Sequence, residues 1–477
     1  MTTLVSTRDV AQSEHTYTEV LLQGLAPDGG LYVPALYPKI DESFLRSIDG
    51  APYPVVVARV KKLFVGGGIP DDVLDEMTAK AYAMETFQQD KVGVVTPLTE
   101  IQRNFYIQNL SLGPTASFKD MAMQMIGREM EYVLHEQGKT LSILGATSGD
   151  TGSAAEAALK GLNGIQICML SPQIGMSAFQ KAQMGALSGG NVLNVSVDGR
   201  FDDCQDLVKS IKNIPEFAHL GAVNSINFAR ICSQIPYYVA GYLQAVRHIG
   251  DVIDVAVPSG NFGNVLSAYY AKQLGLPIRN LIVATNENAV LHRVFTTGVY
   301  SLTPAQITSS PSMDISKASN YERLVFDILG RDAEKTARYM HIFETEKLVD
   351  LQAFGVAPNA LASLGFRSGS SSHAERIATI RHIYERSGKV LDPHTADGVG
   401  VALTHFDGGV GIPMLCMETA LPVKFEHTIK EALGGHVPER PQRFKNIESQ
   451  ITSDAFTSMP ASAETLMDVL RAHGFSA

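Results

Sequence analysis

The sequence predicts an α/β fold in which mostly parallel sheets carry helices on both faces. From about residue 92 onward, short apolar segments typical of strands alternate with helical segments. Two of these apolar segments end in loops rich in glycine or hydroxyl residues that lead into a helix. The 477 residues, 45% of them hydrophobic, are enough for about three domains of the usual size.

The first 90 residues differ from the rest and form a predicted N-terminal unit. A helical stretch covers residues 72–86, and the remainder is broken by prolines and by glycines at positions 29–30 and 66–68. Beyond this unit, the predicted strands are residues 140–144, 165–170, 192–197, 252–257 and 281–284. Predicted helices follow Lys119, cover residues 153–162 and 177–187, and end at Leu274. Residues 301–389 are mixed, more charged and more helical.

Composition and charge exclude several classes of protein. The formal net charge of −10 and the absence of a basic run argue against a nucleic-acid partner. No apolar stretch approaches the ~18 residues that a membrane span needs, and no signal peptide is visible. The four cysteines lie far apart without a CxxC pair, which favours reduced thiols in the cytoplasm and neither disulfides nor a metal site.

The loop at residues 259–264 is a candidate anion site. It joins a buried strand to a helix, and Gly260 and Gly263 allow the backbone N–H groups to approach a ligand closely. The positive end of the helix dipole favours a phosphate there. The loop is neither a Walker A motif nor a GxGxxG fingerprint, and an ordinary tight turn without a ligand would account for it equally well.

Residues 146–152 form a second strand-to-helix loop, dense in hydroxyl groups. The hydroxyls of Thr147, Ser148 and Thr151 and the local backbone N–H groups suit an anion such as a carboxylate. The alternative is an ordinary helix start in which Asp150 or Thr151 caps the helix.

Lys119 begins a predicted helix, with Ser117 and Asp120 as its capping pair. The helix dipole at this end, together with burial near Phe118, would lower the pKa of the lysine and make it a nucleophile for carbonyl chemistry. The alternative is a solvated surface lysine. Arg230, in the polar cluster at residues 224–230, carries a planar fork suited to phosphate, although an exposed arginine at a helix start would have the same pattern.

Taken together, these segments resemble the threonine synthase family, whose members are pyridoxal-phosphate enzymes of fold type II related to the tryptophan synthase β subunit. The resemblance covers nearly the whole chain, includes the distinct N-terminal domain of the longer subfamily, and is ordered. Its segments are residues 24–34, 113–120, 146–152, 198–204, 224–230, 258–264, 312–316, 391–395 and 418–425.

The resemblance implies a role for each candidate residue. Lys119 would form a Schiff base with pyridoxal phosphate, Asp150 would lie near the 3-hydroxyl of the cofactor, and Thr419 would bond its pyridine nitrogen. The phosphate of the cofactor would be held by Gly260, Asn261, Phe262, Gly263 and Asn264. The substrate carboxylate would be held by Thr147, Ser148, Gly149 and Thr151, and the substrate phosphate by Asn224, Arg230 and Lys181. His394 falls near the site without an assigned role.

The implied fold has two three-layer α/β domains with mostly parallel sheets and a small N-terminal domain. We expect the N-terminal domain at residues 1–90, a large cofactor-binding domain at 91–145 and 246–477 with an inserted helical segment at about 301–389, and a small α/β domain at 146–245. The chain would act as a monomer or homodimer.

The implied reaction converts O-phospho-L-homoserine and water to L-threonine and phosphate by γ-elimination and β-replacement. A neutral Thr419 hydroxyl, in place of an acid, is expected to leave the pyridine nitrogen unprotonated. The alternatives are another fold-type II lyase, namely a serine/threonine dehydratase or a phospho-lyase that releases 2-oxobutanoate, and a non-catalytic protein that binds phosphorylated metabolites.

Overall fold

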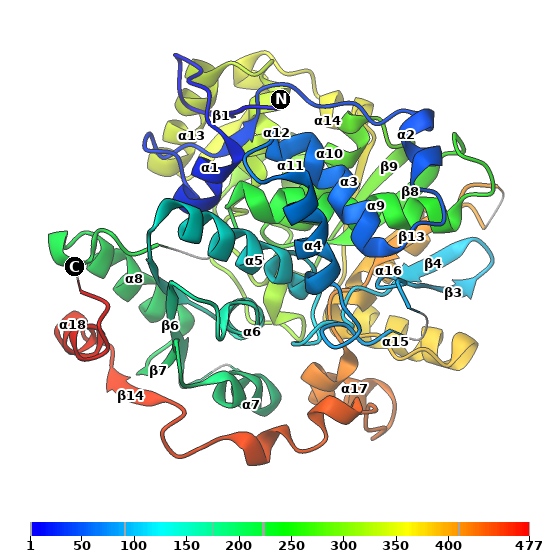
Figure 1. The fold of residues 1–477 in the computed structure, drawn as a ribbon. Coiled ribbons are helices and arrows are strands. Elements are labelled where there is room, and N and C mark those ends of the chain that lie inside the picture. The colour runs from blue at the N-terminus through cyan, green and yellow to red at the C-terminus, as the bar shows by residue number, and fades with distance from the viewer. Residues whose placement is uncertain (1, 90–91, 175, 222–224, 409–410, 477) are drawn as a thin grey trace.

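The computed structural model describes residues 2–89, 92–174, 176–221, 225–408 and 411–476 and confirms the α/β fold (Figure 1). The larger sheet has six strands in the order β12-β9-β8-β13-β4-β3, and every pair in it is parallel except β3 with β4. Its strands are β3 (Leu98–Gln102), β4 (Phe105–Gln108), β8 (Ile253–Pro258), β9 (Ile278–Thr285), β12 (Phe366–Ser370) and β13 (Met414–Met417). All residues of β8 are buried, as expected for a central strand covered on both faces.

The smaller sheet has four parallel strands in the order β14-β7-β6-β5. These are β5 (Leu141–Ala146), β6 (Ile165–Pro172), β7 (Val192–Asp198) and β14 (Thr457–Pro460). This sheet includes β14 and all but the last residue of β5 from the segments expected in the large domain. The C-terminal strand β14 pairs with β7 although the two strands lie far apart in the sequence (Figure 1).

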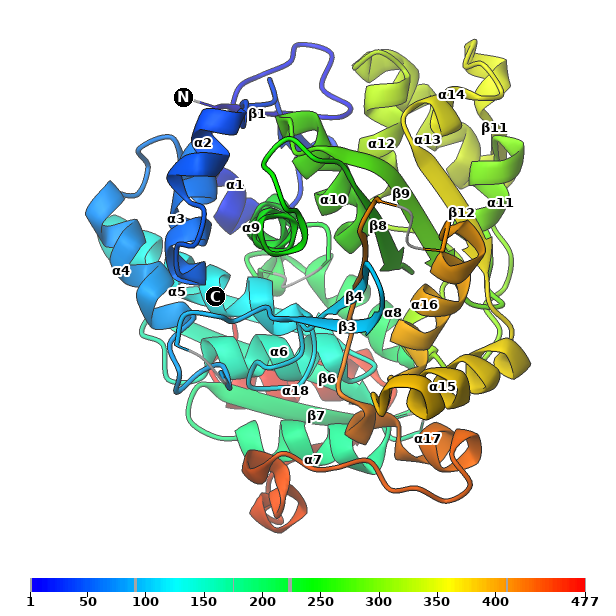
Figure 2. The same ribbon diagram turned by 90° about the vertical axis from the view of Figure 1, so that its right-hand side faces the viewer.

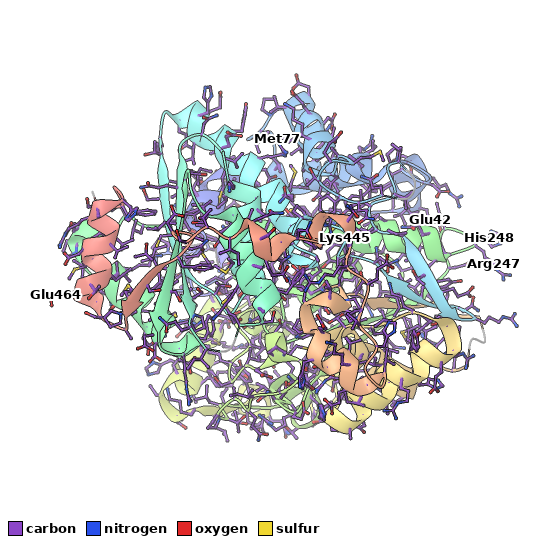
Figure 3. The ribbon with its side chains drawn as sticks, turned by 90° about the horizontal axis from the view of Figure 1, so that it is seen from below. Glu42, Met77, Arg247, His248, Lys445 and Glu464 are labelled. Atoms are coloured by element: carbon purple, nitrogen blue, oxygen red, sulfur yellow. The ribbon has the colours of Figure 1, made fainter. Side chains whose placement is uncertain are left out.

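Helices cover both sheets and surround their shared core (Figure 2). Those that follow strands of the two sheets or pack on them are α5 (Lys119–Gln137), α6 (Asp150–Leu159), α7 (Ala178–Leu187), α8 (Phe201–Lys212), α9 (Phe228–Ala245), α10 (Gly263–Leu274), α11 (Val290–Thr297), α15 (His373–Ser387), α16 (Pro393–His405), α17 (Glu426–Ala432) and α18 (Ala463–Ala472). Figure 3 shows α18, marked by Glu464, at the opposite side of the molecule from Glu42, Arg247 and His248. No helix in the described ranges is both long and apolar enough to cross a membrane.

The segment expected to be an inserted helical region also carries strands. It holds α12 (Tyr321–Ile328), α13 (Ala333–Glu346) and the short α14 (Ala360–Ser363), but β12 within it is the edge strand of the larger sheet. A small antiparallel pair, β10 (Val299–Ser301) with β11 (Leu348–Asp350), joins the two ends of the stretch that contains α12 and α13. The segment is therefore joined to the larger sheet through β12.

The N-terminal unit packs its helices against α5 and α9 (Figure 2). It contains the antiparallel pair β1 (Leu4–Ser6) and β2 (Tyr32–Pro34) and the helices α1 (Tyr17–Gln23), α2 (Glu42–Ser47), α3 (Tyr53–Val65) and α4 (Asp71–Ala81). A fully buried ion pair crosses this contact, with Lys61 Nζ 2.7 Å from Glu129 Oε1 of α5. The same ammonium donates to the Tyr17 hydroxyl at 2.7 Å and to Ser233 Oγ of α9 at 2.9 Å.

Replacement of Lys61 with methionine is expected to destabilise the protein by about 3–5 kcal/mol, because Glu129 would remain buried without its cation. Denaturant unfolding of the single variant and of Lys61→Met combined with Glu129→Leu measures this. The double variant should regain most of the lost stability, since it leaves no unpaired charge. A single variant within 1 kcal/mol of the wild type would contradict the expectation.

Candidate active site

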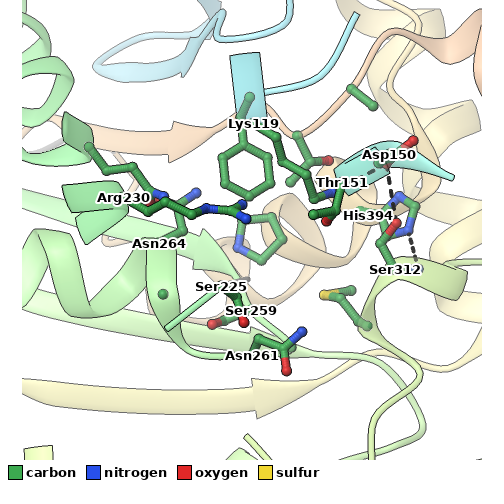
Figure 4. A pocket seen from close by; sticks show the side chains of 18 residues that line it. Lys119, Asp150, Thr151, Ser225, Arg230, Ser259, Asn261, Asn264, Ser312 and His394 are labelled. Atoms are coloured by element: carbon green, nitrogen blue, oxygen red, sulfur yellow. Dashed lines mark hydrogen bonds and ion pairs between the residues drawn. The ribbon is translucent and has the colours of Figure 1, made fainter. Parts of the chain in front are cut away.

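A pocket opens between the carboxyl ends of the two sheets, where loops from both meet (Figure 4). This is the position expected for a ligand site in open α/β sheets. The loop after β8, the first residues of α5 and α6, two residues in the first two turns of α9 and the segment after β13 all contribute to it. The residues predicted for the site that line it are Lys119, Asp150, Thr151, Arg230, Gly260, Asn261, Gly263, Asn264 and Thr419.

Lys119 is the first residue of α5 and lies near the middle of the pocket (Figure 4). The turn before it is held by the segment after β13, because the Phe118 N–H donates to the Thr419 carbonyl at 2.8 Å. Burial lowers the pKa of Lys119, and the positive charges of Lys424 and Arg230 act in the same direction, while Asp150 opposes them. The lowered pKa favours the neutral, nucleophilic amine.

The predicted capping pair of α5 is wrong. The Ser117 side chain does not cap the helix, whose first residue follows Phe118. Asp120 instead accepts hydrogen bonds from the backbone N–H and the hydroxyl of Thr115, at 2.8 and 2.7 Å. The carboxylate thereby braces the loop that carries Lys119, because Thr115 lies at its start.

Asp150 is the centre of a buried polar cluster beside Lys119. Its Oδ1 lies 2.7 Å from Lys424 Nζ and accepts from Gln180 Nε2 at 2.9 Å. Its Oδ2 lies 3.4 Å from Lys119 Nζ and accepts from Ser312 Oγ at 3.3 Å. Although burial alone would raise its pKa, the cations Lys424 and Lys119 hold the pKa of this carboxyl well below its usual value.

The partners of Asp150 were not foreseen from the sequence. Lys424, with its side chain fully buried, and Ser312 both belong to segments of the family resemblance, but no spacing rule connects either to Asp150. Gln180 carried no signal at all, because it reads as an ordinary residue near the start of α7, where its side chain also completes a capping box with Ser177.

At one end of the pocket, buried hydrogen-bonding groups without protein partners converge. Among the described residues, Arg230 leaves Nε and Nη1 unpaired, Asn264 leaves Nδ2 unpaired, and Ser259 leaves Oγ unpaired. The Asn264 amide is oriented by the hydroxyls of Tyr237 and Tyr238, which both lie within hydrogen-bond distance of its Oδ1. Buried donors are normally paired, so this set is the arrangement expected for an anion site.

Backbone geometry supports the same conclusion. A Cβ added to Gly260 would come within 3.1 Å of Met313 Cα and 3.2 Å of the Ser312 carbonyl oxygen, so the loop runs close against its neighbour. Phe262 has φ of +66° and is the N-cap of α10. The positive end of this helix therefore faces the same end of the pocket as Arg230, whose pKa burial lowers to about 10.

Thr419 and His394 lie at another part of the pocket wall. His394 Nε2 accepts from the Ser312 N–H at 3.0 Å, and its Nδ1 lies 3.0 Å from Asp392 Oδ1. The Thr419 hydroxyl lies 2.9 Å from the same oxygen of Asp392. His394 therefore links the wall to the segment that bears Ser312.

Other predicted residues have different surroundings. Those in the described ranges that do not line this pocket are Thr147, Ser148, Gly149, Lys181 and Phe262. Thr147 Oγ1 accepts from the N–H groups of Gly149 and Gly152 at 2.9 and 2.8 Å, so its side chain holds the backbone of this loop in place. Lys181 donates to the Gln173 carbonyl at 2.7 Å.

The buried ring of Phe262 packs among aromatic side chains and does not line the pocket; its centroid lies 5.9 Å from those of Phe295 and Tyr321. Ser148 is exposed. Asn224 lies outside the described residues. No cluster of three or more His, Cys, Asp or Glu side chains in the described part of the chain is placed to hold a metal ion.

Three family models match the chain in order. Residues 3–82 match the threonine synthase N terminus, residues 91–350 the pyridoxal-phosphate dependent enzymes, and residues 395–470 the threonine synthase C-terminal model. The chain is 46% identical over 458 residues to threonine synthase of Corynebacterium glutamicum, covering 93% of each chain. It is also 46% identical over 468 residues to that of Methylobacillus glycogenes, covering 96% of this chain and 97% of the relative.

Solved structures agree with this. A pyridoxal-phosphate-bound threonine synthase from Brucella melitensis superposes with a TM-score of 0.92 at 37% identity, covering 99% of each chain. Threonine synthase from yeast superposes with a TM-score of 0.90 at 33% identity, covering 98% of each chain.

Proposed function

Because the chain belongs to the threonine synthase family of pyridoxal-phosphate-dependent lyases, we propose that it converts O-phospho-L-homoserine and water to L-threonine and phosphate. The observation that supports this most is the juxtaposition of a lysine of lowered pKa with a buried set of unpaired donors in one pocket. A lysine amine suits attachment of a carbonyl cofactor, and the donors suit the phosphates of cofactor and substrate.

The residues of the pocket fit the cofactor. Pyridoxal phosphate supplies an electron sink that stabilises the charge left when a proton leaves the α-carbon of an amino acid. Lys119 would hold its carbonyl carbon, and the loop at residues 260–264 with the unpaired Asn264 Nδ2 would hold its phosphate. Asp150 would lie near its 3-hydroxyl and Thr419 at its ring nitrogen, since both line the pocket.

Substrate binding is assigned to the remaining polar groups. The unpaired guanidinium atoms of Arg230 support a phosphate ligand there, with Asn224 and Lys181 as further candidates. Thr151 lines the pocket at the start of α6, and the backbone around Thr147, Ser148 and Gly149 belongs to the same loop. These groups would hold the substrate carboxylate, because the dipole of α6 favours negative charge at this end.

Lys119 would also move protons. Its ε-amine, tethered at the start of α5, would lie beside the α- and β-carbons of a bound substrate and could accept and return protons there. Asp150, which Lys424 holds ionised, would orient the amino group of Lys119, since Asp150 Oδ2 lies 3.4 Å from Lys119 Nζ. Phe118, Met313 and Ala420 line the pocket and would limit the access of water until phosphate has left.

Incubation with O-phospho-L-homoserine and pyridoxal phosphate is expected to yield threonine and phosphate in equal amounts. Chromatography of the amino acids and a keto-acid assay measure the products. Formation of 2-oxobutanoate without threonine would instead identify a phospho-lyase, and serine or threonine consumed in place of the phosphorylated substrate would identify a dehydratase. Release of no product would favour a binding protein.

All four cysteines are buried free thiols, which supports the cytoplasm as the location.

A further inference from the structure

Asp392 is a buried carboxylate that lies behind Thr419 as seen from the pocket. Its side chain has no solvent exposure, and it is the N-cap of α16. It accepts from the backbone N–H groups of His394 and Thr395, at 3.0 and 3.4 Å, and from the Thr395 hydroxyl. The Thr419 hydroxyl lies 2.9 Å from its Oδ1 and 3.1 Å from its Oδ2.

The hydrogen bonds around Asp392 are those of a carboxylate that acts as an acceptor. The two backbone groups can only donate. His394 Nε2 accepts from the Ser312 N–H, so the ring proton of a neutral His394 lies on Nδ1 and points to Asp392. The N-terminal end of α16 further favours the negative charge.

These partners fix the direction of the Thr419 hydroxyl. A hydroxyl has one proton, and pointing it into the pocket would turn its lone pairs towards the carboxylate. The other neighbour, Thr395 Oγ1 at 3.1 Å, already accepts from the Thr419 N–H at 3.0 Å and has its own proton directed to Asp392. The Thr419 proton therefore points to Asp392, and a lone pair of Thr419 faces the pocket.

We infer that Asp392, acting through Thr419, keeps the ring nitrogen of the bound cofactor protonated. An outward lone pair can accept a hydrogen bond from a protonated ring nitrogen but offers nothing to an unprotonated one. The inference rests on the proposed placement of Thr419 at that nitrogen. It reverses the expectation drawn from the sequence, where the threonine alone predicted an unprotonated ring.

Charge balance points the same way. Among the described residues, the hydrogen-bond and ion-pair partners of Asp392 include no lysine or arginine, and its histidine partner is neutral in this arrangement. A buried carboxylate is stabilised by a nearby cation. A protonated ring nitrogen would supply that positive charge on the other side of the Thr419 hydroxyl from Asp392. The protonated ring would also be the stronger electron sink for the reaction. Asp392 is thus a positioning residue, since it acts on the cofactor only through Thr419.

Asp392→Asn in the full chain, loaded with nitrogen-15-labelled pyridoxal phosphate, tests this. Asparagine keeps an oxygen for the two backbone N–H groups, while its amide can donate to Thr419 and so turn the hydroxyl proton towards the pocket. We expect the ring nitrogen resonance of the wild type at the position of a protonated pyridine, and that of the variant at the unprotonated position. We expect kcat to fall at least about tenfold with little change in KM, as for loss of an interaction made in the transition state.

Two further variants make the test specific. Thr419→Val should leave the ring nitrogen unprotonated, and adding Asp392→Asn to it should change nothing further, because the connecting hydroxyl is gone. An unprotonated ring nitrogen in the wild type, or a protonated one in Asp392→Asn or Thr419→Val, would overturn the inference. If Asp392→Asn does not fold, the spectra of the wild type and of Thr419→Val decide the question. Failure of the wild type to take up the cofactor on Lys119 is a different result, because it would reject the proposed cofactor site.

Discussion

Lys119→Ala is expected to abolish threonine formation, with a loss of kcat/KM of at least about 1,000-fold, because it removes both the attachment point of the cofactor and the base that moves the protons. The visible absorbance band of the lysine-bound cofactor, which borohydride removes from the wild type, should be absent from the variant. Steady-state kinetics with O-phospho-L-homoserine and a visible spectrum of the purified protein measure the two effects.

Lys139→Ala is the matched control for this substitution. Lys139 is an exposed lysine just beyond the other end of α5, where its ammonium donates to Gln137 Oε1 at 3.0 Å. The control should keep both the absorbance band and the activity. A band that persists in Lys119→Ala would show that another lysine carries the cofactor, and Lys424, which shares Asp150 with Lys119, would be the first to test.

Arg230→Gln is expected to raise KM for O-phospho-L-homoserine by about 100-fold. Its Nε and Nη1 have no partner among the described residues, and hydrogen bonds to charged groups contribute about 1.5–3 kcal/mol each, so a loss of about 3 kcal/mol is reasonable. Steady-state kinetics give KM, and fluorescence titration of the cofactor-free protein gives the affinity for pyridoxal phosphate.

The two measurements separate the possible phosphate ligands of Arg230. A raised KM with unchanged cofactor affinity supports the substrate phosphate, whereas weakened cofactor binding would reassign Arg230 to the cofactor phosphate. An effect on neither would contradict an anion-binding role. Arg471→Gln serves as the control, because Arg471 is exposed on α18 and pairs with Glu216 and Asp468 far from the pocket in the fold.

The sequence predicted the strands and helices that have strong periodicity and clear loop chemistry. The expected strands at 165–170 and 192–197 correspond to β6 and β7, and the helix ending at Leu274 corresponds to α10. These elements follow from local patterns, because apolar runs and turn residues act within a few positions of one another. The loop at residues 259–264 and Lys119 could be identified for the same reason, as each is a local motif at the start of a helix.

What the sequence could not decide is how distant polar groups pair once they are buried. By itself it determined the α/β class and the family from the order of the motifs, and it gave Lys119, Arg230 and the loop at 260–264 as candidate site residues. Only the tertiary structure brought β14 to the smaller sheet, Lys424 to Asp150, and Asp392 to Thr419. Burial makes each polar atom find a partner, and the packing of sheets and helices selects which one. The direction of the Thr419 hydroxyl, and with it the inferred protonation of the cofactor ring, therefore follows from three-dimensional contacts that the residue type alone does not specify.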